Sequence, residues 1–234
     1  MKLMSFNTQH CLDYKRQIID FDTMANAIIA CGADIVGLNE MRGEGPGPEH
    51  DAQTDILAEK TGLKHFFFAP ALRENEGPYG NGLLSRYPIV CAAAIPVPDP
   101  CPRRYNGYYE TRCLLKARLE NGLTVLVIHF GLNPDEQENA VRTILENLPE
   151  ERCILMGDFN VTPDDPVLAP IRARMKDAAD LFAAPKLSFP SDKPEIKIDY
   201  IFVTPDLLLT SADIPDLVAS DHRPHLAEIE DIEA

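Results

Sequence analysis

Four short apolar runs, each followed closely by a side chain suited to metal or phosphate chemistry, constrain the fold most strongly. The runs cover residues 2–6, 34–38, 123–128 and 153–156. A carboxylate or imidazole inside a packed sheet must lose its water and find a partner, whereas at a strand end it can face a solvent-filled cleft. The pattern therefore predicts strands that carry polar groups to the edge of a sheet.

The polar groups form five clusters, and their residue types suggest a chemistry. The clusters are Asn7, Glu40, His129, Gly157-Asp158-Phe159-Asn160 and Ser220-Asp221-His222. Oxygen ligands of the kind that Asn7, Glu40 and Asp221 carry are those that Mg²⁺ and Mn²⁺ prefer. Asp158 could orient or deprotonate a water molecule, and Asn160 could donate a hydrogen bond to a phosphate oxygen.

Histidines complete the candidate set, and each candidate also has a simpler explanation. Asp199 begins a later apolar run and is a plausible partner for the ring of His222, because a carboxylate there fixes the tautomer and stabilises imidazolium. Taken singly, Glu40 could be a solvated acid, the 157–160 segment a plain turn and either histidine a partly buried side chain bonded to backbone. Their occurrence together favours a site.

Length and composition favour one soluble domain. The chain has 234 residues, 45% of them hydrophobic, which suffices for one well-buried core, so we expect a single domain over residues 1–234. Neither a membrane-spanning stretch nor a leader pattern is visible, so we expect a cytoplasmic protein without membrane insertion. Six scattered cysteines are interpreted as reduced core thiols.

The charge balance bears on the substrate. Lys and Arg total 22 against 37 Asp and Glu, a formal charge of −15, which repels a polyanion unless a metal ion or a local basic patch intervenes. Small phosphate esters are therefore expected more than duplex nucleic acid, although duplexes remain possible. No protein partner is evident.

Helical periodicity and capping residues predict helices over residues 18–31, ended by Gly32, over 52–60, with Gly62 beyond, and over 134–148, closed by Pro149. Further strands are expected over residues 65–69, 82–85, 89–95, 111–120, 123–130, 198–203 and 225–229. The Asn121-Gly122 pair predicts an antiparallel hairpin with a type I′ turn. Residues 42–48 and 96–109 are predicted loops bordering the site.

Strand direction adds one inference about architecture. Glu40, His129 and Asp158 follow their strands, whereas Asp199 and the Ser220-Asp221-His222 cluster precede theirs. If all of them share one edge, the later strands run in the opposite direction, so the sheets are mixed. With this many strands we expect two packed sheets with helices outside.

Ordered motifs along essentially the whole chain resemble the endonuclease/exonuclease/phosphatase superfamily, with its DNase I-like fold. The motifs, in sequence order, are Met-Ser-Phe-Asn7, Asp-Ile-Val-Gly-Leu-Asn-Glu40, Gly82-Leu-Leu-Ser-Arg-Tyr-Pro-Ile89, Val-Ile-His129, Gly-Asp-Phe-Asn160, Ile-Asp199-Tyr-Ile and Ser-Asp221-His222. The resemblance implies a four-layer α/β/β/α sandwich and hydrolysis of phosphate esters that depends on Mg²⁺ or Mn²⁺.

The resemblance also implies roles by position. Glu40 looks like the principal metal ligand, with Asn7 and Asp221 nearby. Asp158 and Asn160 look like the pair that handles nucleophile and phosphate, His129 and His222 look like the histidines flanking the phosphate, and Asp199 looks like the partner of His222.

Two features depart from the family pattern, and two rival functions remain as alternatives. Asn39 stands where many family members have glutamine, and the acidic partner of His129 is not obvious, with Glu110 as the best guess. Arg112, Tyr109 and Asn81 are the predicted substrate-binding residues.

The rival functions are a DNA endonuclease or exonuclease of the same family and an inactive binding scaffold. An inactive scaffold would show gaps in the motif set.

Overall fold

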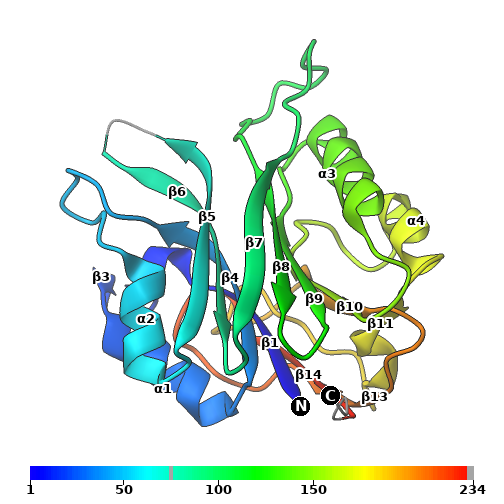
Figure 1. The fold of residues 1–234 in the computed structure, drawn as a ribbon. Coiled ribbons are helices and arrows are strands. Elements are labelled where there is room, and N and C mark those ends of the chain that lie inside the picture. The colour runs from blue at the N-terminus through cyan, green and yellow to red at the C-terminus, as the bar shows by residue number, and fades with distance from the viewer. Residues whose placement is uncertain (74–75, 231–234) are drawn as a thin grey trace.

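The computed structural model describes residues 1–73 and 76–230, which form two mixed sheets packed face to face between helices (Figure 1). In spatial order, the first sheet contains β13 (Leu209–Asp213), β14 (His225–Ile229), β1 (Lys2–Asn7), β4 (Ile35–Arg42), β6 (Pro78–Ser85) and β5 (His65–Arg73). The second contains β11 (Lys176–Asp177), β12 (Asp199–Val203), β10 (Cys153–Asp158), β9 (Thr124–His129), β8 (Cys113–Leu119) and β7 (Ile89–Pro96). The expected α/β/β/α sandwich is confirmed.

Helices cover the outer face of each sheet. Those over the first sheet are α1 (Phe21–Cys31) and α2 (Gln53–Thr61), and those over the second are α3 (Pro134–Asn147) and α4 (Ala169–Arg172). The smaller elements are the 3-10 turns η1 (Gln9–Cys11), η2 (Pro166–Leu168) and η3 (Ala178–Leu181) and the pair β2 (Leu12–Asp13) and β3 (Ile18–Ile19). The sequence patterns predict none of these smaller elements, nor do they predict α4, β11 or β13.

Successive residues of the central strands pack into different layers of core. In β10, Ile154 and Met156 face the other sheet, whereas Cys153 and Leu155 face α3. All four side chains are fully buried. This is why the strand reads as a continuous apolar run: side chains alternate between the two faces, and both faces are covered.

Local signals explain the helix boundaries. The carboxylate of Asp20 caps α1 by accepting from the N–H groups of Asp22 and Thr23, and Gly32 ends the helix with φ of +65°. The predicted start at residue 18 is therefore wrong, because Ile18 and Ile19 instead pair with β2. Gly62, with φ of +76°, ends α2 as expected.

The β8–β9 hairpin is confirmed, but its predicted turn type is wrong. A type I′ turn needs positive φ at both Asn121 and Gly122. Among the described residues of this turn, Gly122 alone has positive φ, at +82°. The N–H of Gly122 bonds to the carbonyl of Leu119, and the N–H of Leu119 bonds to the carbonyl of Leu123. This is the three-residue loop in which a left-handed glycine forms a bulge.

The inference from strand direction is confirmed. β12 runs antiparallel to β10, and β14 runs antiparallel to β1. By contrast, β1 with β4 and β9 with β10 are parallel pairs. Residues at the starts of β12 and β14 therefore meet residues at the ends of β10 and β1.

The cysteines and the helices bear on two further expectations. Cys11, Cys31, Cys113 and Cys153 are buried thiols, whereas Cys91 and Cys101 are free but exposed. The interpretation as core thiols therefore holds for four of the six. Within residues 1–73 and 76–230, no helix combines the length and the apolar character that crossing a membrane requires.

One buried histidine makes stability depend on pH. His225 in β14 is fully buried, its Nδ1 lies 3.1 Å from the carbonyl oxygen of Asp199, and its Nε2 has no partner among the described residues. Burial, together with the positive charge of Lys197, holds the pKa of His225 well below its usual value. The folded state therefore binds fewer protons than the unfolded state below about pH 6.5.

We expect His225→Gln to reduce the loss of stability in acid. Because of this residue, the free energy of unfolding of the wild type should fall by up to about 1.4 kcal/mol for each pH unit below about pH 6.5. Urea unfolding of both proteins at pH 5, 6, 7 and 8 measures the two slopes. Equal slopes for the wild type and the variant would show that His225 takes up its proton equally in the folded and unfolded states.

Candidate active site

Three neighbouring strands of the second sheet bring the first polar groups together. In the β-sheet register, Asp158 lies opposite His129 on β9 and opposite Asp199 on β12. Gly157 precedes it with φ of +151°, and a Cβ atom there would lie 1.8 Å from the carbonyl oxygen of Ile128. Only glycine lets β10 approach β9 this closely at the site, which explains the Gly-Asp pair in the sequence.

Asp158 is the centre of the site. Its Oδ2 lies 3.1 Å from Nδ2 of Asn7, 3.5 Å from Nε2 of His129 and 3.6 Å from Nε2 of His222. Its Oδ1 accepts from the backbone N–H of Asn160. Burial raises the pKa of Asp158, and the positive charge of His222 opposes that rise. Asp158 is thus a basic carboxylate surrounded by hydrogen-bond donors.

The predicted pairing of His222 with Asp199 is present. Nδ1 of His222 lies 2.9 Å from Oδ2 of Asp199, and both side chains are buried. Burial by itself would lower the pKa of His222, but the carboxylates of Asp199 and Asp158 outweigh it and raise that pKa. The ring also packs against Phe189 at 4.8 Å between centroids. His222 is therefore held as an oriented imidazolium.

The acids around His222 also have the spacing of a metal site. Ligand atoms of Asp158, Asp199 and His222 all lie within 4.8 Å of one another, so this buried group could hold a metal ion. Both ring nitrogens of His222 already face carboxylates. The same distances therefore suit a hydrogen-bonded relay. The group differs from the predicted ligand set, since neither Glu40 nor Asp221 belongs to it.

His129 has an unexpected partner. Nη1 of Arg112 lies 3.2 Å from Nδ1 of His129. Glu110 pairs with Arg112 rather than with His129, so the guess that Glu110 is the acidic partner is wrong. A guanidinium can only donate hydrogen bonds, and burial together with the charge of Arg112 keeps the pKa of His129 well below its usual value. His129 is therefore neutral, and its Nε2 lies 3.2 Å from Nδ2 of Asn160.

A β-bulge places Glu40. The register between β4 and β6 shifts between Leu38 and Met41, and Glu40 within this bulge has φ of +61°. Bulges re-aim side chains, and left-handed backbone at a non-glycine residue costs energy that the surroundings must offset. Oε1 of Glu40 accepts a hydrogen bond from Asn7 at 3.0 Å. The strand therefore continues past the residue at which the sequence pattern predicted its end.

The charges around Glu40 fit a cation. Burial raises the pKa of Glu40, and the negative charge of Asp221 raises it further. The pKa of Asp221 is likewise raised, first by burial. Two partly desolvated carboxylates that destabilise each other's charge are what a divalent cation would stabilise. The donor set thus suits a hard cation.

Three asparagines of the first sheet differ in role. Asn7 lies beside Glu40 as predicted, but its Oδ1 accepts from the N–H of Gln9, so its Nδ2 faces the carboxylates. Asn39 links the two sheets by accepting from the N–H of Asp158 and donating to Asn81 and to the carbonyl of Ile128. Asn81 is buried and donates to the carbonyl of Cys113. In this structure the amide of Asn81 supports Asn39 from behind, and its predicted contact with a substrate stays a prediction.

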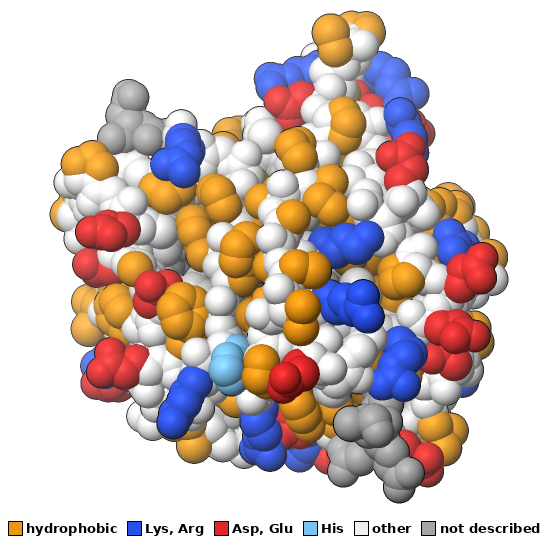
Figure 2. All heavy atoms as spheres, in the orientation of Figure 1, with side chains coloured by type: hydrophobic (Ala, Val, Ile, Leu, Met, Phe, Trp, Pro, Cys, Tyr) orange, Lys and Arg blue, Asp and Glu red, His pale blue; other side chains and the backbone are white. Residues whose placement is uncertain are grey.

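Tyr109 is also a structural residue. Its hydroxyl lies 3.0 Å from both carboxylate oxygens of Asp135 at the start of α3, and Arg103 packs over its ring at 4.7 Å. It holds the loop between β7 and β8 against the start of α3, and its predicted contact with a substrate stays a prediction. Figure 2 shows that loop projecting beyond the rest of the face, with both basic and acidic side chains on it. The exposed rings of the loop are those of Tyr105 and Tyr108.

Two residues near Glu40 were missed by the sequence analysis. Nδ1 of His10 lies 4.0 Å from Oε2 of Glu40, and burial, together with the charge of Arg42, lowers the pKa of His10 to about 4. Tyr79 has its pKa raised by burial and by the charge of Glu40. Neither carried a signal, because His10 lies in an irregular turn and Tyr79 in an ordinary strand.

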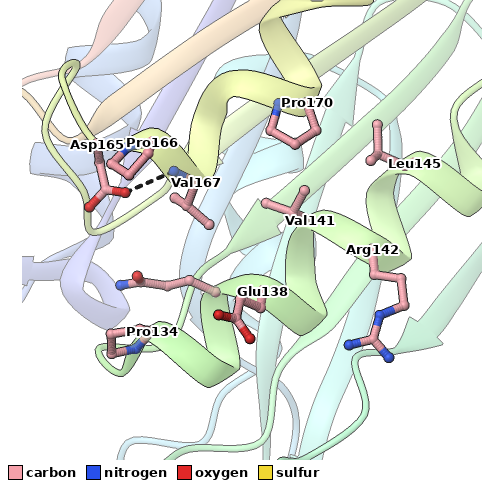
Figure 3. Close-up of a pocket in the computed structure, with 10 residues that line it drawn as sticks. Pro134, Glu138, Val141, Arg142, Leu145, Asp165, Pro166, Val167 and Pro170 are labelled. Carbon is pink, nitrogen blue, oxygen red and sulfur yellow. Dashed lines mark hydrogen bonds between the residues drawn. The ribbon is translucent and has the colours of Figure 1, made fainter.

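An apolar groove lies elsewhere on the molecule. It measures about 680 Å³ and is formed by α3 and the segment that includes η2, with Val141, Leu145 and Val167 on its walls (Figure 3). None of the clustered acids and histidines described above lines it. This apolar groove is therefore separate from the polar groups at the strand ends.

Comparison with known proteins agrees with this arrangement. Residues 4–222 match the profile of the Endonuclease/Exonuclease/phosphatase family. No curated protein sequence is similar enough to count as a relative. An endonuclease/exonuclease/phosphatase structure from Beutenbergia cavernae DSM 12333 has a TM-score of 0.76 and 22% identity, covering 98% of this chain and 71% of that one.

Two further structures extend the comparison. An endonuclease/exonuclease/phosphatase from Bacteroides vulgatus has a TM-score of 0.74 and 21% identity, with 98% of each chain covered. A mannosyl-6-phosphatase of Bacteroides thetaiotaomicron VPI-5482 has a TM-score of 0.72 and 14% identity, covering 98% of this chain and 99% of that one. At these identities the structures establish a shared fold.

Proposed function

Since this chain belongs to the endonuclease/exonuclease/phosphatase family, we propose that it is a metal-dependent phosphoesterase that hydrolyses a phosphodiester or phosphomonoester by in-line attack of water. The single observation that carries the proposal is the surroundings of Asp158. One of its oxygens lies within 3.6 Å of side-chain nitrogens of Asn7, His129 and His222. A buried carboxylate so surrounded is suited to hold a water molecule and take its proton.

The other residues stabilise the phosphoryl group. His222, an imidazolium oriented by Asp199, offers positive charge and a proton to the oxygens on which negative charge develops. Asn160 and neutral His129 lie side by side at the same strand ends and offer further polar contacts. Arg112 fixes the ring of His129 from behind, and Glu110 in turn holds Arg112.

The residues around Glu40 would hold the cation. Glu40 and Asp221 supply the carboxylates, and Asn7 connects Glu40 to Asp158. A bound Mg²⁺ or Mn²⁺ would supply positive charge that polarises the phosphate ester. The intact set of groups weighs against the rival interpretation as an inactive scaffold.

Small phosphate esters of sugars, lipids or nucleotides are the favoured substrates. The formal charge of −15 disfavours long polyanions. A nuclease is the second candidate, and the loop between β7 and β8 favours it, because Arg103, Tyr105 and Tyr108 lie on that exposed loop. Aromatic rings with nearby guanidinium groups can stack bases and contact phosphates.

The test is a hydrolysis assay with bis-p-nitrophenyl phosphate and p-nitrophenyl phosphate. We expect turnover with Mg²⁺ or Mn²⁺ and loss of at least about 100-fold with a chelator, because removing electrostatic stabilisation of the transition state commonly costs that much. A panel of sugar phosphates, nucleotides and single- and double-stranded DNA at two salt concentrations then separates the candidates, since nucleic-acid binding weakens steeply with salt. Activity that survives the chelator would refute metal dependence.

A further inference from the structure

The turn after β1 has unusual backbone geometry. Gln9, His10 and Cys11 have φ values of +46°, +47° and +65°, three consecutive left-handed residues without a glycine. Each such residue costs roughly 1–2 kcal/mol, and strain of this kind persists only where the surroundings hold it. Backbone outliers of this kind cluster at functional sites, so the turn needs an explanation.

The surroundings do hold it. The carbonyl of His10 accepts from Nε2 of Gln53, a fully buried side chain at the start of α2. The N–H of Cys11 bonds to the carbonyl of Thr8, and the carbonyl of Cys11 accepts from the N–H of Asp20. The conformation is therefore determined by residues on both sides of it and fixes where the His10 ring points.

That ring lies against the free side of Glu40. Nδ1 of His10 is 4.0 Å from Oε2 of Glu40, while Oε1 of Glu40 is bonded to Asn7. The side chains of His10 and Glu40 are 23% and 24% exposed, so both reach the solvent. Two atoms that bind one cation at about 2.0–2.2 Å can be at most about 4.4 Å apart. The observed separation is within that limit.

The amide of Asn7 strengthens the case for His10. Because Oδ1 of Asn7 accepts from the N–H of Gln9, the amide turns its nitrogen to Glu40. An amide nitrogen cannot donate a lone pair to a cation. His10, by contrast, has an imidazole nitrogen that can offer a lone pair to a cation beside Glu40, and the strained turn places it there.

We propose that His10 adds an imidazole nitrogen to the carboxylate ligands of the metal site, so that the site favours a later transition-metal cation such as Co²⁺ over Mg²⁺. The proposal rests on the proposed function, because it takes Glu40 as a metal ligand. Imidazole suits first-row transition metals, whereas Mg²⁺ strongly prefers oxygen ligands. His10 thus decides which cation the site retains.

The test is cation binding by calorimetry, with Co²⁺ and Mg²⁺ titrated separately into the metal-free full-length protein. The variants are His10→Asn and His10→Gly, both of which tolerate positive φ. We expect either change to weaken Co²⁺ binding by about tenfold or more, the scale seen when groups that support a metal site are lost, and to leave Mg²⁺ binding within about twofold. The visible absorption of bound Co²⁺ should also change in both variants.

Two controls separate the possible failures. His65→Gln alters a histidine that pairs with Ser85 at the far end of the sheet and should change nothing. Glu40→Gln should abolish binding of both cations. If Co²⁺ binding depends on Glu40 but not on His10, the inference about His10 fails while the proposed function stands. The same holds if the His10 variants weaken Mg²⁺ binding as much as Co²⁺ binding. If the wild type binds neither cation, the proposed metal-dependent function fails with it.

Discussion

Replacing Asp158 with Asn is expected to lower kcat by about 10³- to 10⁴-fold, the upper range for loss of a catalytic base. The physical reason is that Asp158 is the carboxylate on which donors from Asn7, His129 and His222 converge. An amide has nearly the same shape but cannot accept a proton from water. Steady-state kinetics with an aryl phosphate ester measures the effect.

The matched control for Asp158→Asn is Asp206→Asn, which alters an exposed acid beyond the far end of β12 and should leave kcat within about twofold. An amide at this position has an NH2 group that faces the nitrogen donors of Asn7, His129 and His222. Asp158→Asn should therefore melt somewhat earlier than the wild type but remain folded at the assay temperature, which thermal unfolding checks. A folded variant with normal kcat would remove Asp158 from the mechanism.

Replacing His222 with Gln is expected to lower kcat by about 10²- to 10³-fold, the usual effect of removing one electrostatic contact to the transition state. Its ring is buried, and Nδ1 lies 2.9 Å from Oδ2 of Asp199. Burial alone would lower the pKa of the ring, but two carboxylates outweigh that effect and raise the pKa. Gln can donate a hydrogen bond but carries no positive charge. The loss therefore measures the contribution of the imidazolium.

The double variant His222→Gln with Asp199→Asn tests how that effect is organised. Asp199 acts through His222, so adding Asp199→Asn to His222→Gln should cost less than about threefold further, because residues that act as a unit are not additive. Asp199→Asn alone should still lower kcat clearly. Independent, multiplicative losses would show that Asp199 has a separate role, for example as a ligand in the buried cluster with Asp158.

Much of the fold was readable from the sequence because its signals are local. Apolar runs such as residues 153–156 alternate between two cores, and Gly32 ends α1 through its own backbone freedom. The start of α1 was misplaced, because Ile18 continues the apolar pattern although Asp20 forms the cap. Turn geometry in the β8–β9 hairpin was also missed, because Asn121-Gly122 suits more than one turn.

The candidate site could likewise be predicted only in part. The central group of Asp158, His129, His222 and Asp199 followed from polar residues at strand ends, and the structure brings them together. The supporting contacts did not follow. Glu110 proved to hold Arg112 rather than His129, and Asn81 proved to lie buried behind Asn39. The contacts of Arg112 with His129 and of Asn39 with Asn81 join different strands, so spacing along the chain does not predict them.

The sequence by itself determined which chemical groups are available and the strand ends at which they lie, because side-chain type and the alternation of strand residues are local properties of the chain. Only the tertiary structure decided what each group touches. The bulge that turns Glu40, the left-handed turn that presents His10 and the packing of Arg112 against His129 all depend on elements far apart in the chain. Contacts between such elements form only when both sheets pack, and those contacts set the charge of each side chain in the site.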